Sequence, residues 1–186
     1  MRIMTLKLLV AISLTAGLLA IAAYGYTRLA ARFGSSAAPA MASAADQADA
    51  ILVIKSEKRI QLLRDGAVLK EYRISLGSNP HGHKQQEGDR KTPEGRYLID
   101  WRNEHSAYHL SLHISYPNAD DIQHASDAGA PPGGNVMIHG LPNGWGFLGV
   151  LHRRWNWTNG CVAVTDEEMR EIWSLVPNGT PIEIKG

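Results

Sequence analysis

Short extended runs separated by turn residues fill the chain from residue 51 to its end, and this pattern constrains the fold more than any other feature. Apolar and β-branched residues gather in the runs, and Gly, Pro, Asn or Asp stands between them. Asp65-Gly66 between two runs is a strong hairpin signal, because the tight turn needs positive φ angles. The pattern predicts strands at 51–55, 59–64, 67–76, 95–101, 108–115, 135–139, 161–164 and 180–185.

Helical signals are confined to two places in this part of the chain. Thr165 and Glu168 form a capping-box pattern, and a helical apolar period follows it through Met169, Ile172, Trp173 and Val176. Pro177 and Gly179 then end the helix. A shorter helix is expected over 119–126. We therefore predict a mainly β domain, a sandwich or barrel-like sheet of largely antiparallel strands with one or two helices.

The N-terminal part predicts a membrane helix. Residues 8–27 carry no charge, and as a helix they would span roughly 30 Å, the thickness of a bilayer core. We expect an uncleaved signal anchor over residues 1–33. The alternative is a cleaved signal with its site at 40–42 or 42–44, but those sites lie well past the apolar run. Residues 34–50, small and weakly polar, are expected to form a linker to a single domain over 51–186.

The charge balance excludes one class of partner. The formal net charge is +1, yet the only charged residues of the first 45 positions are four basic ones, Arg2, Lys7, Arg28 and Arg32. Removing them from the 19 Lys and Arg leaves 15 against 18 Asp and Glu. A mildly acidic domain is poorly suited to phosphate backbones, so we expect no nucleic-acid partner.

A lone cysteine and a histidine carry the chemical signal. His139 ends one expected strand and Cys161 opens another, so adjacent strands of one sheet would bring them together. Imidazole would take the thiol proton and form an ion-pair nucleophile that attacks carbonyls. Gly160 could aim an amide at a developing oxyanion, and Thr158 could add a hydroxyl. Each residue also has a structural alternative. Cys161 could be buried and inert, and His139 could be a hydrogen-bonded histidine at a strand end. The Thr158 hydroxyl could bond local backbone in a turn, and Gly160 could be a bulge residue.

The whole string around these residues resembles the active-site signature of the YkuD-type L,D-transpeptidases. His139-Gly140 followed by Thr158-Asn159-Gly160-Cys161-Val162 is similar to that family's His-Gly and Ser/Thr-x-Gly-Cys motifs. Thr92-Pro93-Glu94-Gly95 resembles its strand-entry element, and we expect it to be a structural turn. The segments 115–118 and 165–169 are also similar, so the resemblance covers roughly residues 50–186.

The resemblance implies a cysteine acyltransferase of the bacterial cell envelope that acts on peptidoglycan stem peptides. Cys161 would be the nucleophile, His139 the general base and later acid, and Gly160 with Cys161 the backbone donors. The enzyme would cleave after the L-centre of the third stem residue, and a stem amine would resolve the thioester to a 3→3 cross-link. Resolution by water would make it a carboxypeptidase, and release of wall-attached lipoprotein would make it a hydrolase. A non-catalytic wall-binding module is the alternative outside enzymes.

The resemblance also implies a location and leaves some contacts open. An anchored domain would face the periplasm or the outer face of the membrane, while a cleaved signal would leave it secreted. Asn159 and Ala163 depart from the residues common in the family, so substrate contacts there are undetermined. Gly140 offers only backbone, so we expect a carbonyl to orient His139.

Further substrate contacts and a metal site were weighed on residue type. The candidate substrate contacts are Gly140, Tyr116, Trp145, His152 and Arg154, although we read His152 and Arg154 as solvated loop residues. Asn159 is a further candidate support residue beside Gly160. Trp145, Trp155 and Trp157 could line a groove or pack in the core. His105, His109 and His113 share a face, but the alternation of residues 108–114 predicts a strand with one wetted face. We therefore expect no metal and no cofactor.

Overall fold

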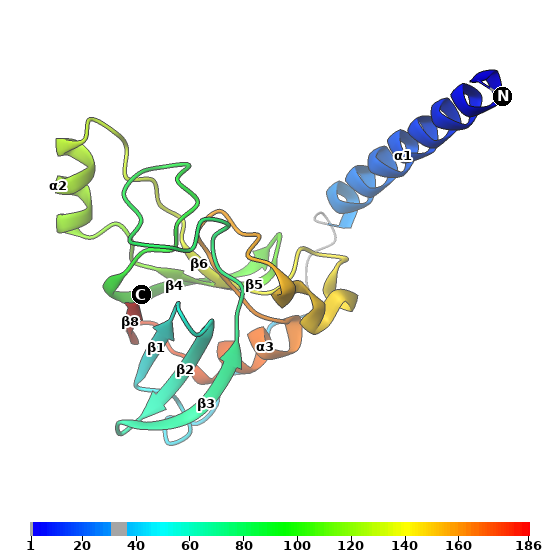
Figure 1. The fold of residues 1–186 in the computed structure, drawn as a ribbon. Helices are drawn as coiled ribbons and strands as arrows, with labels where there is room; N and C mark the ends of the chain where they lie inside the picture. Colours follow the sequence, from blue (N-terminus) through cyan, green and yellow to red (C-terminus); the bar gives the residue numbers. More distant parts are fainter. Residues whose placement is uncertain (1, 31–36) are drawn as a thin grey trace.

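The computed structural model describes residues 2–30 and 37–186, and in these it contains eight strands and few helices (Figure 1). The helices are α1 (Arg2–Ala30), α2 (Ala119–Asp127), α3 (Asp166–Leu175) and the 3₁₀ segment η1 (Gly146–Arg154). The strands are β1 (Ala50–Ile54), β2 (Arg59–Arg64), β3 (Ala67–Arg73), β4 (Gly95–Ser106), β5 (His109–Ile114), β6 (Met137–His139), β7 (Val162–Ala163) and β8 (Pro181–Lys185). The predicted mainly β fold with an N-terminal apolar helix is confirmed.

The strands form one sheet in the order β3-β2-β1-β8-β4-β5-β6-β7. Most neighbours are antiparallel, as predicted, but β1 pairs with β8 and β6 pairs with β7 in parallel. β4 joins the two halves, since it pairs with β8 on one side and with β5 on the other. The parallel β6–β7 pair matters most here, because it carries the two candidate reactive residues.

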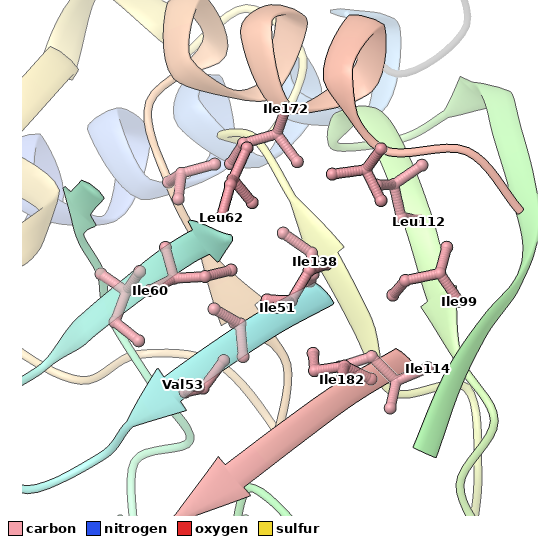
Figure 2. Packing of buried hydrophobic residues seen from close by; sticks show 14 of the residues in the cluster. Ile51, Val53, Ile60, Leu62, Ile99, Leu112, Ile114, Ile138, Ile172 and Ile182 are labelled. Atoms are coloured by element: carbon pink, nitrogen blue, oxygen red, sulfur yellow. The ribbon is translucent and has the colours of Figure 1, made fainter. Parts of the chain in front are cut away.

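Both halves of the sheet face one hydrophobic core (Figure 2). Ile51 and Leu62 come from the first half and Ile99 and Ile138 from the second, and each is almost fully buried. Ile172 of α3 packs over them at one end of the core. Burying an aliphatic side chain of this kind contributes about 1.5–3 kcal/mol, so this shared core holds the two halves together.

The helix α3 begins and ends as its sequence predicts. Thr165 Oγ1 accepts the Glu168 N–H, and the Glu168 carboxylate accepts the Thr165 N–H in return. The helix buries Met169, Ile172 and Trp173. A second capping box, between Asn118 and Asp121, begins α2 where a helix was expected.

Two expectations about strands are wrong. β3 ends at Arg73 rather than continuing to residue 76. Beyond Arg73 the chain no longer pairs with β2, because Ser75 and Gly77 form isolated bridges to Ala163 and Thr158. β4 continues beyond Trp101 to Ser106. A third expectation, that the polar face of β5 is wetted, is also wrong: His109 and Ser111 are buried, and Asn143 Oδ1 accepts the His109 N–H.

The N-terminal segments differ in their relation to the domain. Residues 9–30 of α1 are long and apolar enough to be a candidate membrane span. The expected boundary between anchor and linker, at residues 33 and 34, lies outside the described residues. Residues 37–49 of the expected linker lie against the domain, where Ala42 N–H and Ala48 N–H donate to the carbonyls of Ser174 and Leu175. The Ala48 side chain is buried in the core.

Candidate active site

The register of β6 and β7 brings His139 and Cys161 to one face of the sheet. Ile138 pairs with Val162 and His139 with Ala163, and both Ile138 and Val162 point into the core. Side chains alternate along a strand, so His139 lies on the opposite face from the core. Cys161, one residue before Val162, lies on that same face and diagonal to His139.

A cleft of about 290 Å³ opens over this face. Its lining includes His139, Cys161, Thr158 and Asn159, which are candidate site residues from the sequence. The remaining lining residues are Asn103, Ser106, Tyr108, Ser111, Asn135, Met137 and Trp157. Apart from the apolar Met137, these are uncharged polar side chains and aromatic rings, a lining suited to the backbone of an extended peptide.

His139 is held in one orientation and shielded from water. Its Nδ1 lies 2.6 Å from the carbonyl oxygen of Gly140, and a carbonyl only accepts, so the ring donates its Nδ1–H. The expected orienting carbonyl is therefore that of Gly140. Tyr108 and Trp157 pack against the imidazole, with ring centroids at 4.8 and 5.7 Å. The neutral tautomer keeps the Nε2 lone pair available to accept a proton.

The cysteine sulfur sits among backbone groups at the floor of the cleft. Met137 N–H donates to Cys161 Sγ at 3.4 Å, and the thiol is 3.7 Å from the carbonyl oxygen of Asn135. Burial raises the pKa of the Cys161 thiol, while the Met137 N–H and the Lys84 ammonium act in the opposite direction. Burial also lowers the pKa of His139 to about 4.

These two shifts favour a neutral pair over the resting ion pair that the sequence led us to expect. With the thiol pKa raised and the imidazole pKa lowered, both groups would be neutral at pH 7. A neutral pair transfers its proton as the sulfur attacks, which is general-base catalysis rather than attack by a preformed thiolate.

The turn before the cysteine is fixed by Thr158. Its hydroxyl donates to the Cys161 carbonyl at 2.7 Å and accepts the Gly160 N–H at 3.2 Å. The Thr158 hydroxyl therefore bonds local backbone, which is the structural alternative given above for this residue. It also engages the Gly160 N–H that we expected to face an oxyanion. The backbone donor that contacts the sulfur is the Met137 N–H, at 3.4 Å.

Glycine is required at two points where a neighbouring loop presses on this turn. Gly160 has φ +129°, and a Cβ added there would lie 2.6 Å from the Lys91 carbonyl oxygen. A Cβ added at Gly77 would lie 2.1 Å from the Arg90 carbonyl oxygen. Thr92 accepts the Gly77 N–H at 3.1 Å. The segment around Thr92-Pro93 thus packs against the turn that precedes Cys161, which is a structural role.

The other candidate contacts lie away from the cleft lining. Tyr116 is buried and donates to the Pro132 carbonyl, and Gly140 is buried against Asp166 and His109. Trp145 and His152 line a second cavity, and Arg154 is exposed on η1. The reading of His152 as a solvated residue is wrong.

His152 is 2 % exposed because it packs between two side chains. Its Nδ1 contacts the hydroxyl of Ser75 at 3.2 Å and the Trp157 indole N–H at 3.3 Å. Burial lowers the pKa of His152 to about 4, and the neighbouring Arg153 charge acts in the same direction. The histidine therefore braces Trp157, one wall of the cleft.

Sequence reasoning missed two residues that shape the site. Lys84 is buried, pairs with Asp89 at 2.8 Å and acts on the thiol, yet it is 77 positions before Cys161 and no local motif marks it. Tyr108 begins the alternation of residues 108–114, yet it is exposed and its ring packs at a tilt against that of His139. The signal available for Tyr108 was its place at the start of a strand, next to a turn.

The comparisons with known proteins identify the family of the chain. The YkuD family, described as the L,D-transpeptidase catalytic domain, matches residues 48–184. A curated relative, the putative L,D-transpeptidase YafK of Escherichia coli K12, is 30 % identical over 133 residues, which are 68 % of this chain and 46 % of that protein. The chain thus spans about half the length of the curated relatives it matches.

Two solved structures share the fold. The helical cell shape determining protein Pgp2 (K307A mutant) of Campylobacter jejuni is 24 % identical with a TM-score of 0.55, over 76 % of this chain and 48 % of that one. Bd1075 of Bdellovibrio bacteriovorus is 24 % identical with a TM-score of 0.52, over 81 % of this chain and 52 % of that one. The match over residues 48–184 covers most of the sequence, so the chain belongs to the YkuD family of L,D-transpeptidase catalytic domains.

Proposed function

We propose that this chain is an envelope-anchored cysteine acyltransferase that acts on peptidoglycan stem peptides. The observation that carries the proposal is the shared cleft: the only cysteine of the sequence and an oriented, neutral histidine line it together. The family match supports the substrate class, and α1 supports anchoring in the membrane with the domain on the periplasmic or outer face. The domain division proposed is an anchor, a connecting segment and a catalytic domain over 51–186.

The proposed reaction begins as Cys161 Sγ attacks the carbonyl after the L-centre of the third stem residue. The thiol proton passes to His139 Nε2, since Nδ1–H is engaged with Gly140. The developing oxyanion is stabilised by backbone N–H donors, of which that of Cys161 is available beside the sulfur. The protonated imidazole then gives its proton to the leaving amine as the C–N bond breaks, which leaves a thioester.

An amine from a second stem completes the proposed transfer. The amine attacks the thioester, its proton passes to His139, and the thiolate leaves and is reprotonated to the resting thiol. The product is a 3→3 cross-link, and the energy of the cleaved amide drives the second step. Aromatic shielding of His139 by Tyr108 and Trp157 keeps bulk water from the base and favours an amine acceptor.

Product analysis tests the proposal. The full chain in detergent is incubated with muropeptides rich in tetrapeptide stems, and the products are followed by mass spectrometry. A cross-linked dimer with release of the terminal residue supports transpeptidation, a shortened monomer supports hydrolysis, and unchanged substrate supports a binding module. Cys161→Ala should abolish turnover, and full turnover by that variant would overturn the mechanism.

A further inference from the structure

An exposed apolar surface lies on η1, between the two halves of the site motif. It consists of Phe147, Val150, Leu151 and Trp155, whose exposed fractions are 75, 62, 49 and 53 %. We call these four residues the η1 surface. Large apolar side chains that recur over nine residues of one kinked 3₁₀ segment and its C-cap and remain exposed mark an interaction surface.

The η1 surface adjoins the end of α1. Tyr26 donates its hydroxyl to the Gly144 carbonyl at 2.8 Å, and its ring meets the Trp145 ring edge to face at 6.0 Å. Thr27 and Trp155 line the same apolar cavity of about 270 Å³. Figure 1 shows the yellow to orange η1 segment on the side of the domain that faces α1.

The connection between α1 and the domain is short. Ala37 is already fixed to the domain, since the Arg170 guanidinium donates to its carbonyl at 2.9 Å, and Ala42 bonds to α3 five residues later. Only residues 31–36 separate this fixed segment from Ala30. Even fully extended, the chain from Ala30 to Ala37 reaches roughly 25 Å. An anchored domain therefore stays at the bilayer surface.

The chemistry of this region fits the lipid interface. Trp and Tyr rings are enriched where headgroups meet acyl chains, and Trp145, Trp155 and Tyr26 gather here. Arg154 is exposed beside the η1 surface and Arg28 lies at the end of α1, which suits anionic headgroups. Apolar tips flanked by rings and basic groups are typical of a segment that lies in the membrane interface.

We infer that the η1 surface inserts into the headgroup and acyl boundary of the membrane that α1 spans. This inference rests on the proposed anchoring and is independent of the proposed acyl transfer. Trp157, two residues after Trp155, lines both the apolar cavity and the reactive cleft, so the lipid-seated segment is joined directly to a residue of the cleft wall. Membrane contact thus fixes the orientation of the cleft relative to the bilayer.

Site-directed spin labelling of the full chain tests the inference. Cys161→Ser removes the only cysteine, and single cysteines are then introduced by Phe147→Cys, Ile122→Cys or Leu18→Cys. Ile122 is the matched control, an apolar residue 52 % exposed on α2, which lies at the far side of the domain in Figure 1. Each labelled chain is placed as a single copy in nanodiscs with anionic lipid. Collision with oxygen, which concentrates in lipid, and with a water-soluble nickel complex is measured at each label.

The label at position 147 should collide strongly with oxygen and weakly with nickel, close to the label at position 18 and unlike that at position 122. If the label at position 147 collides with nickel as freely as the label at position 122, the surface faces water and the inference is overturned. Weak collision with both reagents would show that protein covers it, which also overturns the inference. A label at position 18 that meets nickel freely would instead defeat the anchoring on which the inference rests. Turnover of the wild type is measured separately, so failure of the chemistry remains distinguishable.

Discussion

At Cys161 the chain combines a nucleophile with a setting that keeps it protonated at rest. Burial raises the free energy of the thiolate by more than the Met137 N–H and the Lys84 charge lower it, so the pKa of the thiol rises. In the proposed envelope-anchored enzyme this would have a use, because a thiol reacts with oxidants far more slowly than a thiolate does. The nucleophile is then activated only when a carbonyl and the imidazole are both in position.

Alkylation kinetics should reveal the protonated thiol. The rate of Cys161 modification by iodoacetamide should rise with pH and reach half its maximum above the ordinary thiol value of roughly 8.5. The measurement is a series of pseudo-first-order rates from pH 6 to 10, with glutathione as the reference thiol. A plateau already reached below pH 7 would mean that an ion pair exists at rest.

Gly160→Ala should destabilise the chain by more than the strain of its backbone alone. A methyl group at φ +129° would also meet the Lys91 carbonyl at 2.6 Å, so we expect a loss of about 3 kcal/mol in the free energy of unfolding, with loss of turnover. Gly179→Ala is the control, since its φ is +90° but no atom lies within 4 Å of the added Cβ. That control should cost about 1 kcal/mol. Equal losses in urea titrations of the two variants would contradict the close contact.

Individual site residues were predictable only where a motif carries them. Cys161 and His139 could be paired from the residues around them, and the register of β6 and β7 puts both on one face. The effect of Lys84 on the pKa of the thiol could not be found in this way, because Lys84 lies in a loop where it pairs with Asp89 and no motif links it to Cys161. The Gly160 amide was assigned to an oxyanion since the sequence does not reveal that Thr158 accepts it.

Among the elements, α3 makes two separate interactions through the carboxylate of Glu168. Glu168 closes the capping box with Thr165 and also forms an ion pair with Arg153 of η1. Asp166, in the same first turn, accepts the Leu141 N–H at 2.7 Å just after the His139-Gly140 pair. The start of α3 therefore fixes both ends of the segment between the two motifs.

Thr165→Ala should remove one cap bond and cost about 1 kcal/mol in the free energy of unfolding. Glu167→Ala, an exposed residue of the same turn, is the control and should cost only a few tenths through the helix dipole. Urea titration followed by far-ultraviolet circular dichroism measures both. The role of the cap would be refuted by a Thr165→Ala variant as stable as the control.

Elements with a strong local signal were predictable, and the others depend on distant partners. Caps and apolar periods located α2 and α3, and alternation with turn residues located the strands. The segment η1 was not predicted, because it is a 3₁₀ segment kinked at Gly149 and its sequence has no helical cap. β4 continues to Ser106 since β5 pairs with it there, a contact that its own polar residues do not announce.

Across the whole molecule, the fold class was predictable and the strand order was not. The parallel pairing of β1 with β8 joins the beginning and end of the domain, and no local pattern encodes that choice of partner. The same long-range closure explains why residues 37–49 belong to the domain surface: they run beside α3 before β1 begins. What reads locally as a flexible linker is ordered by partners far along the chain.

Stability of the whole molecule should fall as the pH drops from about 6.5 toward 4. Burial lowers the pKa of both His139 and His152 to about 4, so each is neutral when folded but takes up a proton near pH 6.5 when unfolded. A histidine whose pKa is lower in the folded than in the unfolded state stabilises the fold at pH values above its unfolded-state pKa. That stabilisation is lost as the pH falls through the folded-state pKa. Each histidine should cost on the order of 2 kcal/mol between pH 7 and 4.5.

Urea titrations at those two pH values measure the difference in the free energy of unfolding. His152→Gln should shrink it, while His105→Gln, whose side chain is 89 % exposed, should leave it unchanged. The Asp89 carboxylate, whose pKa is lowered, responds below this window, and glutamates with lowered pKa would lower stability at pH 4.5 in the same direction as the histidines. Equal stability at pH 7 and 4.5 would therefore show that the two histidines are not buried in the neutral form.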